Sequence, residues 1–219
     1  MSRTAALSGL AGIALLDVGW FWDPTPPIDW SAPHLASYFA SHGNSQWLIA
    51  AVLQLLAVPL LWHFGAVVRD RLAAGGASPR TARIAGGAGK GFALTALVFG
   101  VCYSVFPFTA LISDVGAPRP EIYRFWYSGT FAVYVPFSTA FVAVLIGAVC
   151  TGALRSRAVP LALGIAGIPL ALLTLGNFFL PMAGITLWFA AASIALAATR
   201  RPSAGAAVPA PRAAVPTTV

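Results

Sequence analysis

Charged residues are scarce in this 219-residue chain, where they make up 9% of the sequence. A soluble domain carries about 25% charged residues, so this chain lacks the polar surface that water requires. Hydrophobic residues instead make up 58%, and the mean hydropathy is +0.81. The composition therefore argues against a soluble domain and predicts an integral membrane protein.

Cysteine is nearly absent as well. The two cysteines, Cys102 and Cys150, fall in different apolar runs and at different depths, which argues against a disulfide and against a zinc or redox motif. The chain also lacks a paired-histidine metal motif, the acid pair of prenyl-diphosphate chemistry and a nucleophile elbow. We therefore expect no metal and no cofactor.

The net charge of +7 is distributed in short segments between apolar runs. A nucleic-acid-binding protein concentrates such charge on one polar face, so we expect no nucleic-acid partner.

Long apolar runs dominate what is present. A helix that crosses a membrane needs about 20 apolar residues, and six segments qualify: 5–22, 47–68, 91–112, 129–154, 158–180 and 182–199. The uncharged run over 158–199 would reach about 63 Å as one helix, so we expect it to turn at Pro181. The sequence predicts an all-α fold, with a membrane domain over 1–200 built from six transmembrane helices.

The basic residues set the predicted orientation. With six crossings, one side of the membrane receives Arg3, Arg69, Arg71, Arg80, Arg83, Lys90, Arg155, Arg157, Arg200, Arg201 and Arg212. Basic residues of short loops stay in the cytoplasm, so both termini are expected there. The bias toward Ala, Gly, Pro and Arg is typical of a GC-rich bacterial genome, which predicts the bacterial cytoplasmic membrane. The uncharged, proline-rich tail over 201–219 is expected to be disordered.

Two segments between the spans carry further predictions. In the first outer loop, 23–46, a short amphipathic helix is expected on the membrane interface, starting near Ser31. The glycine-rich stretch 86–91 resembles a phosphate-binding loop only superficially, because Ile84 and Gly91 replace the required glycine and Ser or Thr. It is expected to be a flexible loop.

Asp17 is the only acid inside a predicted span. Such a residue costs about 2.5–3.5 kcal/mol at a helix centre, and an ionisable residue in a membrane is a functional candidate by default. By depth, the same outer half of the bundle holds Gln54, Tyr103, Tyr134 and Asn177. These five residues predict an outward-facing pocket, with Asp17 as the candidate catalytic group. Alternatively, they bond to one another or to the backbone and fix the helix packing.

The missing catalytic constellation favours a protein that binds or handles a lipophilic small molecule within the lipid bilayer. One alternative is an intramembrane enzyme of cyclase or isomerase type, with Asp17 as general acid. A second alternative is a small proton-coupled transporter with Asp17 as its coupling site. The oligomeric state is not defined by the sequence.

Three segments carry a resemblance to a family. They are Trp22-Asp23-Pro24 at the end of the first span, ASYFASH over 36–42, and LLWHF over 60–64 ahead of 69–72. Over residues 5–75 the chain resembles the uncharacterised bacterial membrane proteins of the DUF4386 type. The resemblance implies about six spans and no assigned activity, and it supplies no catalytic residues.

Overall fold

A computed structural model describes residues 3–22, 25–41, 45–112, 118–156, 159–176 and 182–198. The regular elements of the described residues are all helices: α1 (Arg3–Ala6), α2 (Ser8–Phe21), α3 (Ala32–Ser41), α4 (Ser45–Ala74), α5 (Pro79–Ile112), α6 (Pro120–Ser156), α7 (Leu161–Gly176) and α8 (Met182–Ala198). The predicted all-α fold class is confirmed at this level, and the short helix predicted within 23–46 is present as α3. Its place on the membrane interface stays a prediction. We call the end of the bundle that carries α3 its outer end, after the predicted orientation.

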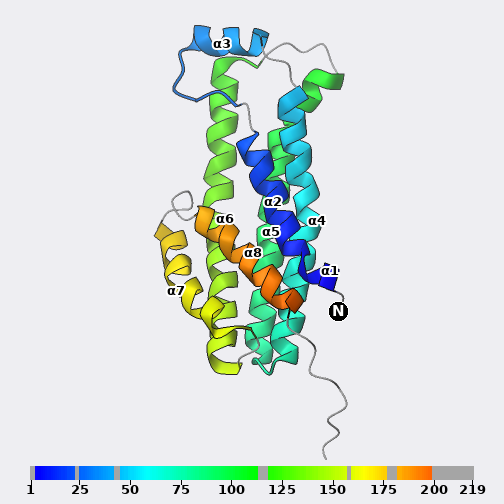
Figure 1. The fold of residues 1–219 in the computed structure, drawn as a ribbon. Helices are drawn as coiled ribbons and strands as arrows, with labels where there is room; N and C mark the ends of the chain where they lie inside the picture. The colour runs from blue at the N-terminus through cyan, green and yellow to red at the C-terminus, as the bar shows by residue number, and fades with distance from the viewer. Residues whose placement is uncertain are drawn as a thin grey trace, which may run out of the picture.

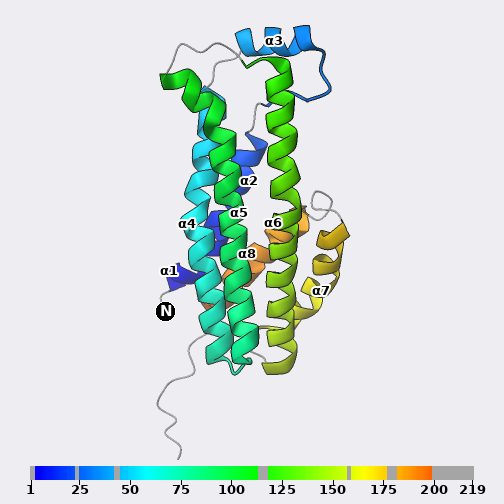
Figure 2. The same cartoon turned by 180° about the vertical axis from the view of Figure 1, so that it is seen from behind.

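Three long helices form the body of the molecule. Helices α4, α5 and α6 contain 30, 34 and 37 residues, which correspond to about 45, 51 and 56 Å. They lie side by side along the length of the molecule, and α3 lies across one end of them (Figures 1 and 2). Because a bilayer core is about 30 Å thick, each of these helices is long enough to cross it.

Within the described residues, four helical segments are long and apolar enough to span a membrane: Thr4–Phe21, Gln46–Ala74, Pro79–Thr109 and Pro120–Ser156. The two remaining predicted spans are helical but shorter, with 16 residues in α7 and 17 in α8, or about 24 and 26 Å. A complete crossing by α7 and α8 therefore stays a prediction. The predicted turn at Pro181 and the tail over 201–219 lie outside the described residues.

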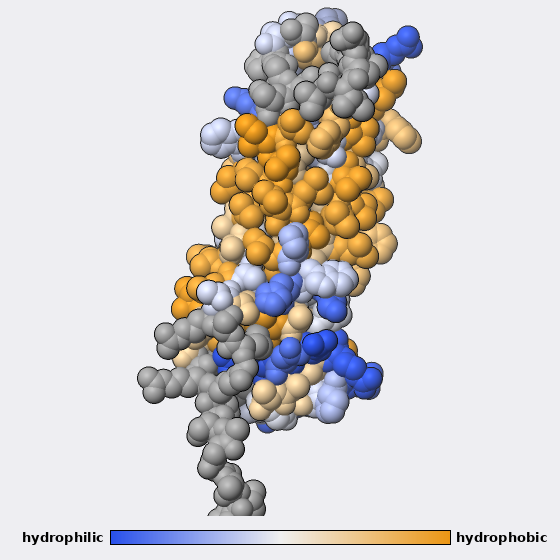
Figure 3. All heavy atoms as spheres, turned by 90° about the vertical axis from the view of Figure 1, so that its right-hand side faces the viewer, coloured by the Kyte–Doolittle hydropathy of each residue, from blue (hydrophilic) through white to orange (hydrophobic). Residues whose placement is uncertain are grey.

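The surface of the bundle matches this assignment. On the face shown in Figure 3, a broad band of hydrophobic side chains covers the middle of the molecule, and hydrophilic ones gather toward the end opposite α3. On α4, the outward side chains Ile49, Val52 and Leu56 are exposed. Near the other end of α4, the ammonium of Lys90 lies 4.9 Å from the centre of the Trp62 ring. The band is the surface expected to face lipid tails.

The glycine-rich stretch 86–91 is not a loop, and that prediction was wrong: these residues are helical and belong to α5. A Cβ added to Gly89 would lie 2.6 Å from Cα of Gly65 on α4. The backbones of α4 and α5 thus approach each other at a point where only glycine fits. Glycine costs about 1 kcal/mol per residue inside a helix, and this cost is the reason that the stretch was predicted to be a loop. The close contact between α4 and α5 offsets the cost.

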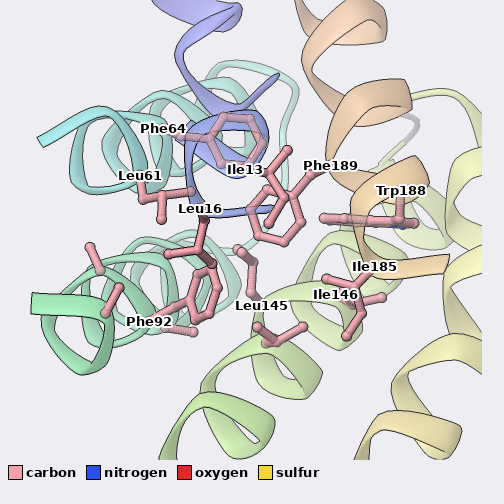
Figure 4. Packing of buried hydrophobic residues seen from close by; sticks show 14 of the residues in the cluster. Ile13, Leu16, Leu61, Phe64, Phe92, Leu145, Ile146, Ile185, Trp188 and Phe189 are labelled. Atoms are coloured by element: carbon pink, nitrogen blue, oxygen red, sulfur yellow. The ribbon is translucent and has the colours of Figure 1, made fainter. Parts of the chain in front are cut away.

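The hydrophobic core lies where α2, α4, α5, α6 and α8 meet. Side chains from these five helices converge there: Ile13, Leu16, Leu61, Phe64, Phe92, Leu145, Ile146, Ile185, Trp188 and Phe189 (Figure 4). Phe189 is central, with its ring 5.4 Å from that of Phe64 and 5.8 Å from that of Phe92. The core therefore packs α8 against α2, α4 and α5.

Two hydrogen bonds define the extent of α8 along the bundle. Near its start, the hydroxyl of Thr186 donates to Oδ2 of Asp17 at 2.7 Å. Near its end, Nη2 of Arg71 donates to the carbonyl of Leu196 at 2.8 Å. Helix α8 thus runs from the level of Asp17 to the level of the basic residues that close α4.

The level of Asp17 follows from the contact between α2 and α4. A Cβ added to Gly19 would lie 3.0 Å from Cγ of Gln54, and Asp17 is two residues further from the outer end of α2. Asp17 thus lies slightly deeper in the bundle than Gly19 and close to the depth of Gln54 on α4. Its depth below Trp47 therefore corresponds to about eight residues of α4, or about 12 Å. Helix α8 begins at this depth, well below the outer aromatic residues.

Candidate ligand groove and the Asp17 chamber

Asp17 lies half-buried in a small chamber between α2, α6 and α8. The chamber has a volume of about 10 Å³ and is lined by Ile13, Leu16, Asp17, Trp20, Phe92, Tyr134, Met182, Ile185 and Thr186. None of these nine residues is a lysine, arginine or histidine. Among the described residues, the hydroxyl of Thr186 donates a hydrogen bond to the carboxylate of Asp17. The chamber therefore holds one acid without a lining cation.

A much larger groove lies between α5 and α6. It has a volume of about 540 Å³ and is lined by Leu94, Thr95, Val98, Phe99, Cys102, Phe125, Trp126, Gly129, Thr130, Val133, Tyr134, Phe137 and Phe141. Several lining side chains are largely exposed, including Phe125 at 83% and Phe137 at 54%. The groove is thus a mostly apolar cleft that opens on the outer surface of the bundle.

Small residues of α6 help to create this groove. A Cβ added to Gly129 would meet no atom within 4 Å, so the space beside it is open. At the inner end the two helices close together, because a Cβ added to Gly91 would touch the ring of Phe141. The outer end is held by Trp126, whose indole Nε1 donates to the carbonyl of Cys102 at 2.8 Å.

Tyr134 separates the groove from the chamber and belongs to the lining of both. Its side chain is buried, its ring lies 4.4 Å from that of Phe99, and its hydroxyl is hydrogen-bonded to Ser138. It also lies close enough to Asp17 for an electrostatic interaction. A single side chain therefore forms the partition between an apolar cleft and the acid.

The hydroxyl groups at the floor of the groove bond to one another. The Ser138 hydroxyl donates to Oγ1 of Thr95 at 3.0 Å, and the Thr95 hydroxyl donates to the carbonyl of Phe92 at 2.8 Å. Tyr134 and Ser138 are four residues apart on α6, a spacing that places both on one face of the helix. The hydroxyl of Thr95, which lines the groove, is thus hydrogen-bonded within the protein.

The predicted pocket residues lie at three places. Asp17 and Tyr134 line one chamber, as just described. Gln54 is buried between α2 and α4, and its side-chain oxygen and nitrogen have no hydrogen-bond partner among the described residues. Tyr103 lies nearer the outer end, where its hydroxyl donates to Oγ1 of Thr25 at 3.1 Å. Asn177 lies outside the described residues.

An aromatic cluster at the outer end was not predicted from the sequence. Trp47, which opens the predicted second span, is 4% exposed. Its ring lies 5.8 Å from those of Tyr103 and Trp126, and 6.0 Å from that of Phe39 on α3. Only the high density of aromatic residues on both sides of the predicted outer loops could have indicated this cluster.

Hydrogen bonds tie the first outer loop to α6. The buried hydroxyl of Tyr123 donates to the carbonyl of Pro26 at 2.5 Å. The guanidinium of Arg124 donates to the carbonyls of Ile28 at 3.0 Å and Trp30 at 2.5 Å. The loop is therefore part of the packed structure. Among the described residues, no three His, Cys, Asp or Glu side chains gather in a way that could hold a metal ion.

The helices and their apolar surface indicate a membrane-embedded, multi-pass protein. No protein-family model matches the chain, and neither a curated protein nor a solved structure matches it.

Proposed function

We propose that the chain is a multi-pass protein of the bacterial cytoplasmic membrane that binds a lipophilic molecule in the groove between α5 and α6. The observation that carries the proposal is the groove itself. Its volume of about 540 Å³ falls within the range of about 300–1,000 Å³ that is common for small-molecule sites. Its lining is mainly hydrophobic and aromatic, as such sites usually are.

The polar groups of the groove also favour an apolar occupant. Thr95 and Ser138 are bonded within the protein, so they do not require a polar ligand. A hydrocarbon portion can therefore cover Thr95 without leaving its hydroxyl unpaired. The exposed rings of Phe125 and Phe137 border the opening, which supports entry from the lipid phase rather than from water.

The groove lies mainly in the outer half of the bundle. Its lining on α6 extends from Phe125 to Phe141, or about 24 Å along the helix. Trp126 lies within this stretch and contacts Trp47 in the outer aromatic cluster. Tryptophan and tyrosine favour the interface between lipid and water, so we place this end of the groove beside the outer headgroups.

The proposed topology keeps both termini in the cytoplasm, with six membrane-embedded helical segments. In this arrangement α7 and α8 enter from the cytoplasmic side as a pair, because α8 ends beside Arg71 and basic loop residues stay inside. Kinship with the DUF4386 type is part of the same proposal. We favour binding over catalysis by Asp17, since this acid is not part of the lining of the groove.

A substitution that fills the groove tests the proposal. Leucine at Gly129 extends into open space beside the cleft, while Gly147 on the same helix has equally open space and does not line the groove. The probe is a long alkyl chain that carries a photoactivatable diazirine, added to the protein in phosphatidylcholine nanodiscs. Labelled peptides are located by mass spectrometry.

In the unaltered protein we expect saturable labelling of the α5 and α6 segments that line the groove. Gly129→Leu should reduce this labelling about tenfold, the effect of losing about 1.4 kcal/mol of binding, while Gly147→Leu leaves it unchanged. Labelling that spreads evenly over the exposed leucines of α7, does not saturate and ignores both substitutions would contradict the proposal.

A further inference from the structure

The chamber beside the groove contains an acid that has no cationic neighbour in its lining. Intramembrane acids are costly, and they usually pair with a cation or line a functional path. The Thr186 hydroxyl supplies one hydrogen bond to Asp17, which does not balance a negative charge. Arg71 lies at the far end of α8, on the carbonyl of Leu196. When Asp17 is ionised, the lining of the chamber therefore leaves its negative charge unbalanced, so a cation carried by a bound molecule would be stabilised there.

The dimensions of the chamber restrict how such a partner arrives. A volume of about 10 Å³ holds about one water molecule, so no organic group fits while the walls stay in place. The wall toward the groove is the ring of Tyr134. Two residues further along α6, Pro136 removes a backbone hydrogen bond at this level of the helix. Rotation of the Tyr134 side chain would join the chamber to the groove.

The aromatic walls on both sides of the partition suit a positive charge. Trp20 and Phe92 face the chamber, and Phe99 and Trp126 face the groove. Aromatic faces attract quaternary and tertiary ammonium groups, and the attraction grows when the cation is removed from water. An ammonium group that passes Tyr134 would move from one set of rings to another and end beside Asp17.

We propose that the occupant of the groove is a lipophilic cation, with its hydrocarbon portion between α5 and α6 and its ammonium group beside Asp17 after Tyr134 has turned aside. This inference rests on the proposed binding function and adds the charge of the ligand to it. It assigns Asp17 to ligand recognition, with Thr186 holding the carboxylate in place through its 2.7 Å hydrogen bond.

Two matched probes separate this inference from the binding function. The first is an alkyl trimethylammonium that carries a diazirine next to the charged end. The second has the same shape, but carbon replaces the quaternary nitrogen. Both are titrated into phosphatidylcholine nanodiscs, and their concentrations are expressed as mole fractions in the bilayer. The readouts are the half-saturating mole fraction and the peptides labelled.

In the unaltered protein we expect the cation to bind about tenfold more tightly than its neutral isostere, a ratio that corresponds to about 1.4 kcal/mol. The cation should label α2 and α8, near Trp20 and Met182, while the neutral probe labels α5 and α6. Asp17→Asn keeps the size of the side chain and should reduce the ratio to about one. Asp29→Asn removes an exposed acid of the outer loop and should leave the ratio unchanged.

The outcomes are distinguishable. If both probes label the groove with equal affinity, or if Asp17→Asn keeps the tenfold preference, the cation inference is wrong and the binding function stands. If neither probe labels the groove in a saturable way, the binding function fails, and the cation inference fails with it. Labelling of α2 and α8 that depends on charge and on Asp17 supports both.

Discussion

Two glycines of α5 should respond to the same substitution in opposite directions. Gly87 is exposed, and a Cβ added there would meet nothing within 4 Å. Gly89, half a turn further, is buried, and a Cβ there would lie 2.6 Å from Cα of Gly65 on α4. Alanine gains about 0.8–1.0 kcal/mol over glycine inside a helix when nothing obstructs its side chain.

The different surroundings of Gly87 and Gly89 determine whether alanine stabilises or destabilises the protein. Gly87→Ala should raise the free energy of unfolding by up to about 1 kcal/mol. At Gly89 the same gain is opposed by the separation of two backbones, and the overpacking of such contacts costs about 1–3 kcal/mol. The difference between the two variants should therefore be about 1–3 kcal/mol, with Gly89→Ala the less stable.

The measurement is thermal unfolding in detergent micelles, followed by circular dichroism at 222 nm. For a chain of this length, about 1 kcal/mol corresponds to about 2–4 °C in Tm. We expect Gly87→Ala to unfold at a higher temperature than the unaltered protein, and Gly89→Ala at a lower one. Equal shifts of the same sign would refute the close approach of α4 and α5 as the reason for glycine at position 89.

Two further predictions concern the outer loop and the depth of α8. Tyr123→Phe leaves the buried carbonyl of Pro26 without its hydrogen-bond donor. The substitution should lower the free energy of unfolding by about 1–3 kcal/mol and increase hydrogen exchange in segment 25–31. Unchanged exchange would show that the loop is held by other contacts. In a chain with Cys102 and Cys150 replaced by alanine, an impermeant maleimide added outside should label Ser37→Cys but not Met182→Cys, because α8 begins about 12 Å below the level of Trp47. Equal labelling of both would place the start of α8 at the outer surface.

Hydropathy was sufficient to predict the helical segments, because each apolar run of about 20 residues forms a helix in a medium without water. It was less successful at the ends of the helices. The predicted second span stops at 68, whereas α4 continues to Ala74, and the predicted third span begins at 91, whereas α5 begins at Pro79. These extensions contain arginines and glycines, and the packing of α4 against α5 stabilises them as helix.

The candidate site illustrates a second limit. Depth along a helix follows from the number of residues, so the sequence could place Asp17, Gln54, Tyr103 and Tyr134 in one half of the bundle. The direction of each side chain depends on how the helices pack. Helices that are apolar on every side carry no pattern that reveals this direction. Asp17 and Tyr134 therefore share a chamber, whereas Gln54 faces α2 and Tyr103 faces the aromatic cluster.

The groove could not be predicted from the sequence, because it results from the separation of α5 and α6 between two points of contact. One is the approach of Gly91 to Phe141, and the other is the bond from Trp126 to the carbonyl of Cys102. Neither contact has a signature in hydropathy or spacing.

At its outer end, α6 contributes side chains both to the groove and to the contact with the first outer loop. Phe125 and Trp126 border the groove, and the adjacent Tyr123 and Arg124 bind the carbonyls of the first outer loop. These residues occupy a single turn of one helix and cannot move separately. A shift of α6 that widens the cleft would therefore pull the loop and α3 with it. If a ligand enters the groove as proposed, its binding would also change the shape of the end of the protein that carries α3.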